Sequence, residues 1–96
     1  MSGIYAIEHT KSGARYIGSS SDIRGRWLRH RSRLRRGRHH CDLLQTAWSI
    51  NGESEFRLVV LEEVANIFQL TIREQAWLDQ TDYPFNRIKS YNPNAV

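Results

Sequence analysis

The sequence predicts an α+β fold, in which three helices flank a small, mainly antiparallel three-stranded sheet. Two observations predict it: β-forming segments separated by polar turn residues lie near the N-terminus, and longer segments with helical periodicity follow them. The 96 residues have room for one domain, so residues 1–96 are expected to fold as a single unit. A hydrophobic content of 40% and a charged content of 25% are typical of a globular protein.

Three segments have the composition of strands. Residues 3–8 and 14–18 are rich in β-forming side chains and flank the turn residues 10–13, so they are expected to form a hairpin. Residues 56–61 form a nearly continuous apolar run interrupted by one arginine, which indicates a strand that is buried on at least one face. The tail, residues 83–93, is expected to be irregular with one short strand.

The pairing of the hairpin decides which side chains share a face. If His9 pairs with Ala14, Tyr5 lies opposite Gly18. Tyr5 and Tyr16 then lie on the same face, one diagonal step apart. A shift of one residue would separate them. Taken alone, such a pair of tyrosines is more often structural than functional.

The first helix is expected to begin at Ile23, after the N-cap candidate Asp22, and to end at Gly37. Its buried stripe on a helical wheel consists of Ile23, Trp27, His30 and Leu34. Arg26 lies at the edge of this stripe, one helical turn from His30. A histidine on an apolar face is more often a core residue than a catalyst, so its position alone does not indicate catalysis.

Two further helices are expected, over residues 43–50 and from Asn66 to about Asp79. The apolar stripe of the last helix consists of Ile67, Leu70, Trp77 and Leu78. Glu74 lies in the middle of this stripe. Because removing an ionised carboxylate from water is costly, Glu74 requires a partner or a metal ion. A buried salt bridge with Arg26 is the structural alternative.

The excess positive charge lies in one segment. Between Asp22 and Asp42 there are eight arginines and no acidic residue, whereas the rest of the chain holds six basic and ten acidic residues. The eight are Arg24, Arg26, Arg29, Arg31, Arg33, Arg35, Arg36 and Arg38. Guanidinium groups bind phosphates in a bidentate manner, so the segment indicates nucleic acid as a partner. A solvated helix face, or an arm that binds an acidic protein, is the alternative.

The sequence argues against several other classes of protein. The longest fully apolar run, residues 58–61, is far shorter than the roughly 18 residues of a membrane helix. The first residues lack the pattern of a signal peptide, so a secreted protein is not expected. Cys41 is the only cysteine, which excludes an internal disulfide. Residues 39–41 suggest zinc at first sight, but three adjacent residues cannot readily surround one tetrahedral ion.

Two tripeptides separated by ten residues, Gly3-Ile4-Tyr5 and Tyr16-Ile17-Gly18, resemble the paired signature of the GIY-YIG nucleases. The downstream pattern of that family continues in the same order with Ser19, Ser20, Arg26, Trp27, His30, Gly37, His39, Arg73, Glu74, Tyr91 and Asn92. The resemblance covers essentially the whole chain and is closest to the catalytic domain of phage group I intron homing endonucleases. Members related to the bacterial excision-repair nuclease carry a lysine shortly after the second tripeptide, where this chain has three serines.

The resemblance implies a GIY-YIG nuclease fold and a metal-dependent DNA endonuclease that leaves 5′-phosphate and 3′-hydroxyl ends. The catalytic residues that it implies are Tyr5, Tyr16, Arg26, His30, Glu74 and Asn92. Glu74 would bind one divalent ion, Mg²⁺ or Mn²⁺, and Arg26 would hold the phosphate oxygens. Tyr5 would act as general base with help from His30, and Tyr16 would bind the phosphate or a water on the metal. Because a phenol ordinarily titrates near pH 10, the base role requires a group that lowers this pKa.

The resemblance also implies the partners. The residues expected to contact DNA are Arg24, Arg29, Arg31, Arg33, Arg35, Arg36, Arg38 and His39, with His39 near the rim. Homing enzymes attach a separate DNA-recognition region, so we expect such a region or a second protein to supply most of the sequence preference. The domain is expected to be monomeric in isolation, and a full break requires dimerisation on DNA or sequential nicking. The expected location is the cytoplasm of a bacterial or phage-infected cell.

The alternative function is a non-catalytic nucleic-acid-binding module. In that interpretation the arginine-rich helix is a phosphate clamp, and the tyrosines belong to the core. The alternative predicts binding that falls with salt and that depends neither on Mg²⁺ nor on Glu74.

Overall fold

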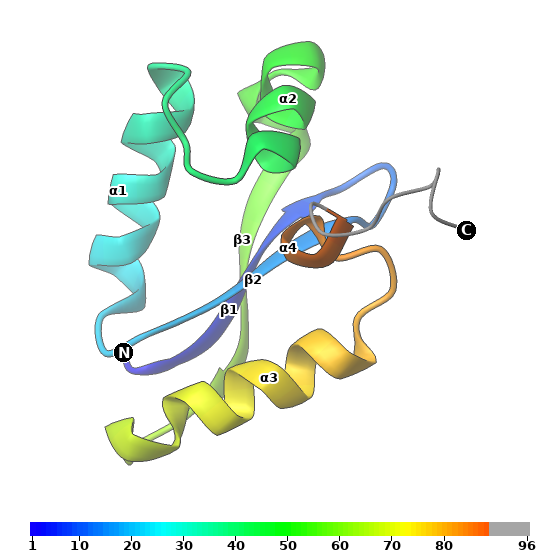
Figure 1. Ribbon diagram of the computed structural model, residues 1–96. Coiled ribbons are helices and arrows are strands. Elements are labelled where there is room, and N and C mark those ends of the chain that lie inside the picture. The colour runs from blue at the N-terminus through cyan, green and yellow to red at the C-terminus, as the bar shows by residue number, and fades with distance from the viewer. Residues whose placement is uncertain (89–96) are drawn as a thin grey trace.

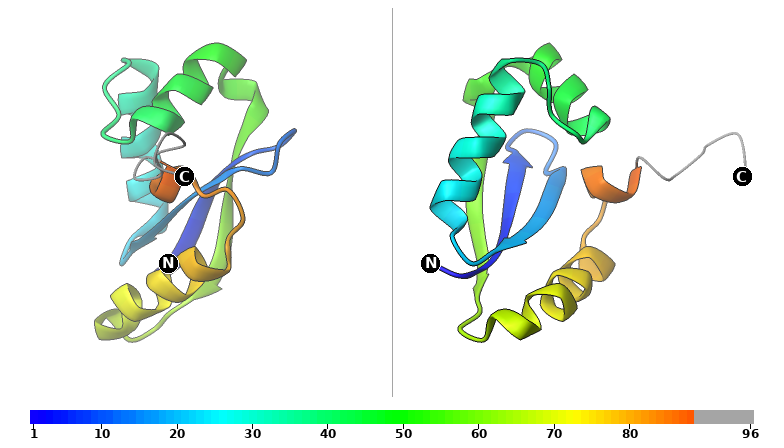
Figure 2. Two further views of the ribbon diagram at one scale, coloured as in Figure 1. Left: turned by 45° about the vertical axis from the view of Figure 1, so that its right-hand side comes forward. Right: turned by 60° about the vertical axis from the view of Figure 1, so that its left-hand side comes forward.

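The computed structural model describes residues 1–88 and has three layers (Figure 1). The elements in chain order are β1 (Gly3–His9), β2 (Arg15–Ser20), α1 (Ile23–Arg35), α2 (Asp42–Asn51), the 3₁₀ turn η1 (Glu53–Glu55), β3 (Phe56–Glu63), the 3₁₀ turn η2 (Ile67–Gln69), α3 (Leu70–Gln80) and α4 (Phe85–Ile88). The helices α1, α2 and α4 cover one face of the sheet, and α3 covers the other (Figures 1 and 2).

The sheet is antiparallel with the strand order β2-β1-β3. Its hairpin has the predicted register, with Tyr5 opposite Gly18 and Ile7 opposite Tyr16. Every residue of the central strand β1 is buried, which explains why this strand lacks a polar alternation. The predicted fold class, a three-stranded antiparallel sheet with flanking helices, is confirmed.

The alternating side chains of β1 supply two separate cores. Tyr5 and Ile7 face α1 and α2, where they pack with buried residues of both helices such as Leu34 and Leu44. Ile4 and Ala6 face the opposite side and pack in the cluster that α3 covers. Tyr5 is therefore part of the larger core, which fixes its position.

Helix α1 has the predicted boundaries. The carboxylate of Asp22 accepts a hydrogen bond of 3.1 Å from the backbone N–H of Gly25, which satisfies one of the unpaired donors of the first turn. Gly37, with a φ of +71°, ends the helix in the left-handed region that favours glycine. The stripe residues Ile23 and His30 are buried as expected.

The start of the last helix and the tail differ from the prediction. The side chain of Asn66 accepts a hydrogen bond from the backbone N–H of Phe68 and closes the short turn η2, so the α-helix begins only at Leu70. Ile67 consequently leaves the apolar stripe and is 54% exposed. In the tail, residues 85–88 form the short helix α4, and Pro84 precedes its first residue, where a fixed φ suits a helix start. The short strand expected within residues 83–93 is not formed over residues 85–88, and residues 89–93 lie outside the described part of the chain. Within residues 1–88, no helix is long and apolar enough to span a bilayer.

Candidate active site

In the hairpin, the side chain of Tyr5 on β1 extends across the neighbouring strand β2. The ring of Tyr5 is 1% exposed, and its phenol lies directly over Gly18. A Cβ atom at position 18 would lie 2.4 Å from the phenol oxygen, which is too close for any side chain. Gly18 of the second tripeptide is therefore required, because only glycine leaves enough space for the ring of Tyr5 from the first tripeptide.

Helix α1 places His30 against both tyrosines. A hydrogen bond of 2.6 Å joins His30 Nε2 to the hydroxyl of Tyr5, and His30 is only 3% exposed. The ring of Tyr16 packs edge-on against His30, with 5.2 Å between the ring centroids. The predicted grouping of the two tyrosines with the helix histidine is thus present in the structure.

The prediction that His39 lies near the substrate rim is wrong. His39 is 5% exposed and lies behind His30, with its Nε2 atom 2.7 Å from His30 Nδ1. The chain turns back at Gly37, and Gln45 of α2 then accepts a hydrogen bond from the backbone N–H of His39. The adjacent His40 is exposed instead, and its Nε2 atom bonds the hydroxyl of Tyr16 at 2.9 Å.

Two hollows meet at His40. One has a volume of about 290 Å³ and is lined by Arg26, Arg29, His30, Arg33 and His40. The other has a volume of about 190 Å³ and is lined by Tyr16, His40, Cys41 and Asn86. Together they give the arginine side of α1 a concave, basic surface that ends at an exposed imidazole and a phenol, which suits a phosphate group.

Glu74 approaches from the opposite layer. It lies on α3 and is half-buried, and the hydroxyl of Ser19 donates a hydrogen bond of 2.5 Å to its Oε1 atom. Because β2 is an edge strand, a side chain of α3 can lie beside it. Burial raises the pKa of both Tyr5 and Tyr16, and the charge of Glu74 adds to this increase. Within residues 1–88, no three histidine, cysteine or carboxylate side chains cluster as a metal site.

Both phenols are harder to ionise than in water. Burial, and then the charges of Tyr16 and Glu74, raise the pKa of Tyr5, while the Arg26 guanidinium counteracts this by its charge and a hydrogen bond. Burial, and then Cys41 and Glu74, raise the pKa of Tyr16 to about 12. Arg26 is the group near both phenols that favours their ionised forms.

The lowered pKa values of His30 and His39 favour neutral rings at physiological pH. Burial, together with the neighbouring His39 and His40, lowers the pKa of His30 to about 3. Burial and His40 lower the pKa of His39 to about 4. The three rings stack, with centroid distances of 4.9 Å between His30 and His39 and 4.4 Å between His39 and His40. A positive charge on one ring would repel its neighbours.

These depressed pKa values predict that stability falls in mild acid. An unfolded histidine titrates near pH 6.5, so below this pH the unfolded chain binds protons that His30 and His39 of the folded chain do not bind. The free energy of unfolding should therefore decrease as the pH falls from about 6.5 toward 4. Urea unfolding at neutral pH and near pH 5 measures this, and His39→Gln should weaken the pH dependence. An unchanged dependence in this variant would contradict the assignment.

Sequence reasoning missed Asn86. Its side-chain Oδ1 accepts a hydrogen bond of 2.8 Å from the backbone N–H of Ile17, and its Nδ2 donates one of 2.7 Å to the Ile17 carbonyl oxygen. The amide thus pairs with the edge of β2 as another strand would. The sequence carries no periodic signal for such a contact, because it joins residues 69 positions apart. Asn92, the asparagine that the resemblance favoured, lies outside the described residues.

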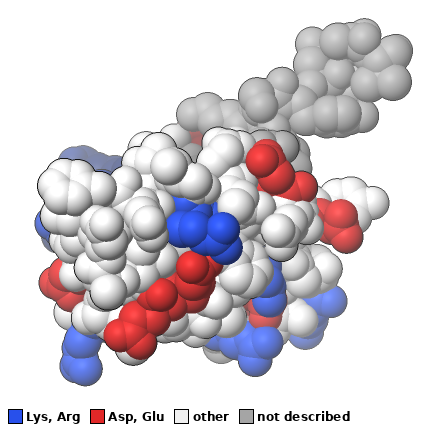
Figure 3. Space-filling view, turned by 90° about the horizontal axis from the view of Figure 1, so that it is seen from below, with Lys and Arg blue, Asp and Glu red and all other residues white. Residues whose placement is uncertain are grey.

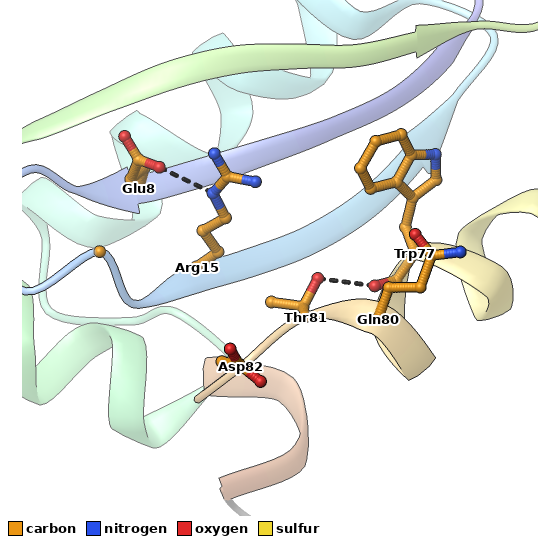
Figure 4. A pocket seen from close by; sticks show the side chains of 7 residues that line it. Glu8, Arg15, Trp77, Gln80, Thr81 and Asp82 are labelled. Atoms are coloured by element: carbon orange, nitrogen blue, oxygen red, sulfur yellow. Dashed lines mark hydrogen bonds and ion pairs between the residues drawn. The ribbon is translucent and has the colours of Figure 1, made fainter.

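A further hollow lies between the hairpin and α3 (Figure 4). It has a volume of about 270 Å³ and is lined by Glu8, Gly13, Arg15, Trp77, Gln80, Thr81 and Asp82. Arg15 donates to the buried carboxylate of Glu8 at 2.7 Å, and Arg57 also binds it. The side of the molecule that carries α3 shows acidic and basic side chains interspersed (Figure 3). Neither this hollow nor the surface on the α3 side has the uniform positive charge of the arginines on α1.

Comparison with known proteins decides the family. The profile of the GIY-YIG catalytic domain matches residues 1–93. The chain belongs to the GIY-YIG family. The prediction of that family is therefore confirmed, and the paired tripeptides are its signature in this GIY-YIG domain.

Individual relatives agree with this membership. The intron-associated endonuclease 1 of Enterobacteria phage T4 is 35% identical over 92 residues, which cover 95% of this GIY-YIG domain and 36% of that protein. A solved structure of the catalytic domain of homing endonuclease I-TevI has a TM-score of 0.80 and 30% identity, covering 88% of this chain and 97% of that one. A glutamate-to-alanine mutant of that catalytic domain has a TM-score of 0.78 and 32% identity, covering 95% and 91%.

Proposed function

We propose that this GIY-YIG domain is a metal-dependent DNA endonuclease that hydrolyses phosphodiester bonds and leaves 5′-phosphate and 3′-hydroxyl ends. The observation that carries the proposal is the convergence of Tyr5, Tyr16, Arg26 and Glu74 beside an arginine-lined hollow. These groups match the needs of the reaction, which are an activated water, stabilisation of phosphoryl charge and help for the departing oxygen. The relatives named as endonucleases support the endonuclease part of this proposal.

The residues present fit one Mg²⁺ or Mn²⁺ ion at Glu74. Magnesium commonly binds through one or two carboxylates and keeps several waters, so a single half-buried carboxylate is sufficient. Ser19 holds one carboxylate oxygen in place, which gives the carboxylate a fixed orientation. When bound, the ion would neutralise charge on the phosphate and on the departing oxygen.

The protein side chains supply the rest of the chemistry. The exposed guanidinium of Arg26 would bind the non-bridging phosphate oxygens, where charge increases in the transition state. Tyr5 would accept the proton of the attacking water as its phenolate, and His30 and Arg26 would offset part of the increase in the pKa of Tyr5 that burial causes. Tyr16 and His40, at the junction of the two hollows, would bind the phosphate. Asn92 remains a proposed member of the site.

Incubation with supercoiled plasmid tests this function. We expect nicked or linear products with Mg²⁺ or Mn²⁺ and none with a chelator, and end-labelling should detect 5′-phosphate ends. A protein that retards the plasmid with equal strength in both conditions, without cutting it, would instead be the phosphate clamp. That outcome would overturn the nuclease proposal.

The structure distinguishes the arginines of α1 that line the hollow from one that forms an ion pair elsewhere. Arg29 and Arg33 line the hollow beside Arg26, and we propose that they bind phosphates next to the scissile one. Arg35, in contrast, donates two hydrogen bonds of 2.6 Å to the carboxylate of Glu53, which lies away from the hollow. The remaining arginines of the segment stay general candidates for DNA contact.

This separation predicts different salt dependences of DNA binding. Each phosphate contact contributes about −0.9 to the slope of log K against log salt on duplex DNA. Arg29→Ala and Arg33→Ala should each make the slope less negative by about this amount, whereas Arg35→Ala should change it little. Fluorescence anisotropy of a labelled duplex at several salt concentrations measures the slopes. Equal effects of all three substitutions would contradict the grouping.

We propose that residues 1–96 form one catalytic domain of a homing-type endonuclease. The chain spans 36% of the length of the phage T4 relative, which leaves room there for other regions. A separate DNA-recognition region or second protein would supply sequence preference, because the arginines that line the basic hollow would contact phosphates rather than bases. The domain alone would be monomeric and would bind DNA weakly. A full break would require dimerisation on DNA or sequential nicking. The protein would act in the cytoplasm of a bacterial or phage-infected cell.

A further inference from the structure

A continuous chain of hydrogen bonds runs from the backbone of the α1–α2 turn to Tyr5. The backbone N–H of Cys41 donates to His39 Nδ1 at 3.0 Å. His39 Nε2 bonds His30 Nδ1 at 2.7 Å, and His30 Nε2 bonds the hydroxyl of Tyr5 at 2.6 Å. All four residues are buried, so water does not compete for these bonds.

The first bond of the chain decides the direction of the others. A backbone N–H can only donate, so His39 Nδ1 must be an acceptor without a proton. The proton of neutral His39 is then on Nε2, which donates to His30 Nδ1. His30 in turn carries its proton on Nε2 and donates it to the phenol oxygen of Tyr5.

The neutral state of both rings supports this order. A doubly protonated His39 would direct an N–H toward the N–H of Cys41, and a doubly protonated His30 would direct one toward the N–H of His39. Burial and the stacked neighbouring imidazoles also keep both pKa values far below neutrality.

We propose that the backbone N–H of Cys41, acting through His39, fixes the tautomer of His30 so that His30 donates a hydrogen bond to the phenol oxygen of Tyr5. His39 is thus a positioning residue of the active site. This inference rests on the proposed nuclease function and assigns a task to a residue that touches no substrate.

The direction of this bond determines what His30 does in the reaction. Tyr5 cannot donate its own proton to an N–H group, so the phenol proton is directed away from His30. When Tyr5 ionises, His30 and Arg26 both donate to the phenolate, which favours the ionised form. His30 therefore stabilises the phenolate and is not the group that removes the phenol proton.

Helix α2 holds the donor side of the chain of bonds in place. Gln45 accepts a hydrogen bond from the backbone N–H of His39 at 3.0 Å and donates to the carbonyl oxygen of Leu34 at 3.1 Å. One side chain thus ties the turn that carries His39 to the end of α1. This leaves His39 little freedom to rotate away from His30.

NMR spectroscopy can test the tautomers directly. Long-range ¹H–¹⁵N spectra of protein labelled with ¹⁵N-histidine distinguish a proton on Nδ1 from one on Nε2. At neutral pH we expect the Nε2–H tautomer for both His30 and His39. His30 with its proton on Nδ1 would overturn the proposal.

Two nearly isosteric substitutions of His39 sharpen the test. His39→Gln retains a side-chain N–H donor toward His30, so His30 should keep its Nε2 proton. His39→Glu, when ionised, offers only acceptors, so the proton of His30 should move to Nδ1. An Nε2–H tautomer of His30 in the folded Glu variant would overturn the proposal. The resonances of His9, which bonds Ser12 and Glu55 elsewhere, report whether each variant is folded.

A third variant distinguishes the contribution of the backbone N–H of Cys41 from that of its thiol. Cys41→Ala removes the thiol but keeps the N–H, so both tautomers should stay as they are in the wild type. A changed tautomer in this variant would show that the thiol, not the N–H, directs the chain of bonds, and would overturn the proposal.

Plasmid cutting provides the functional measurement. We expect His39→Glu to cut at least about tenfold more slowly than His39→Gln at saturating protein, because a hydrogen bond to a charged oxygen is lost. Duplex affinity should be similar, since His39 lies behind the site. Equal rates in the two variants would overturn the positioning role. Because NMR does not depend on cutting, failure of this inference is distinguishable from failure of the nuclease proposal.

Discussion

Glu74→Gln is expected to reduce cutting by about 10³-fold or more, because a neutral amide cannot hold the divalent ion that supplies several kcal/mol of charge stabilisation. Ser19 can still donate its hydrogen bond to the amide oxygen, so the protein should remain folded. The rate of plasmid nicking at increasing Mg²⁺ concentrations measures the loss. Duplex binding in the absence of metal should stay close to that of the wild type.

A matched control lies on the same helix. Asp79 is exposed on α3 and accepts a hydrogen bond from Gln75. Asp79→Asn removes one negative charge from α3 just as Glu74→Gln does, and it should cut at the wild-type rate. Similar losses in both variants would indicate a general effect of charge, and undiminished cutting by Glu74→Gln would refute the role of this carboxylate.

Arg26→Ala is expected to reduce cutting by about 10²- to 10³-fold, the usual effect of removing one preorganised donor from a developing oxyanion. The loss has a second source, because Arg26 is also the group that favours ionisation of both phenols. Without it, Tyr5 should require a higher pH to act. The pH dependence of the cutting rate should therefore shift toward alkaline values, which a purely structural residue would not cause.

Two comparisons isolate the guanidinium. Arg26→Lys keeps the charge but loses the planar pair of donors, so its rate should lie between those of the wild type and Arg26→Ala. Lys11→Ala removes an exposed cation of the hairpin turn that pairs with Glu55, and this variant should cut normally. If Arg26→Ala lost DNA affinity alone, with an unchanged rate at saturation, its proposed role in the transition state would be wrong.

The register of the hairpin was predictable because the alternation of side chains along a strand is a local rule. Strand parity alone placed Tyr5 opposite Gly18 and put both tyrosines on one face, and the structure confirms this register. The same holds for α1, where a capping carboxylate and a terminating glycine mark the ends. The paired tripeptides then combined these local signals into a family that the comparisons confirm.

The arrangement of the histidines was not predictable from the sequence. His39 and His40 are neighbours, yet one is buried behind His30 and the other reaches the surface at Tyr16. Which of the two turns inward depends on the turn after Gly37 and on Gln45 of the next helix, and neither leaves a periodic pattern. Ionic partners such as Glu53 for Arg35 depend likewise on tertiary packing.

The contact between Asn86 and Ile17 has a consequence for the architecture of longer proteins that contain this fold. An unpaired strand edge invites association with another chain, and here the edge in question carries the second signature tripeptide. Because Asn86 of α4 pairs with the backbone of Ile17 at this edge, α4 should keep a neighbouring copy from extending the sheet beside the candidate active site. A fusion junction placed upstream of α4 would remove that protection and favour aggregation, so α4 belongs to the smallest unit that can be transplanted intact.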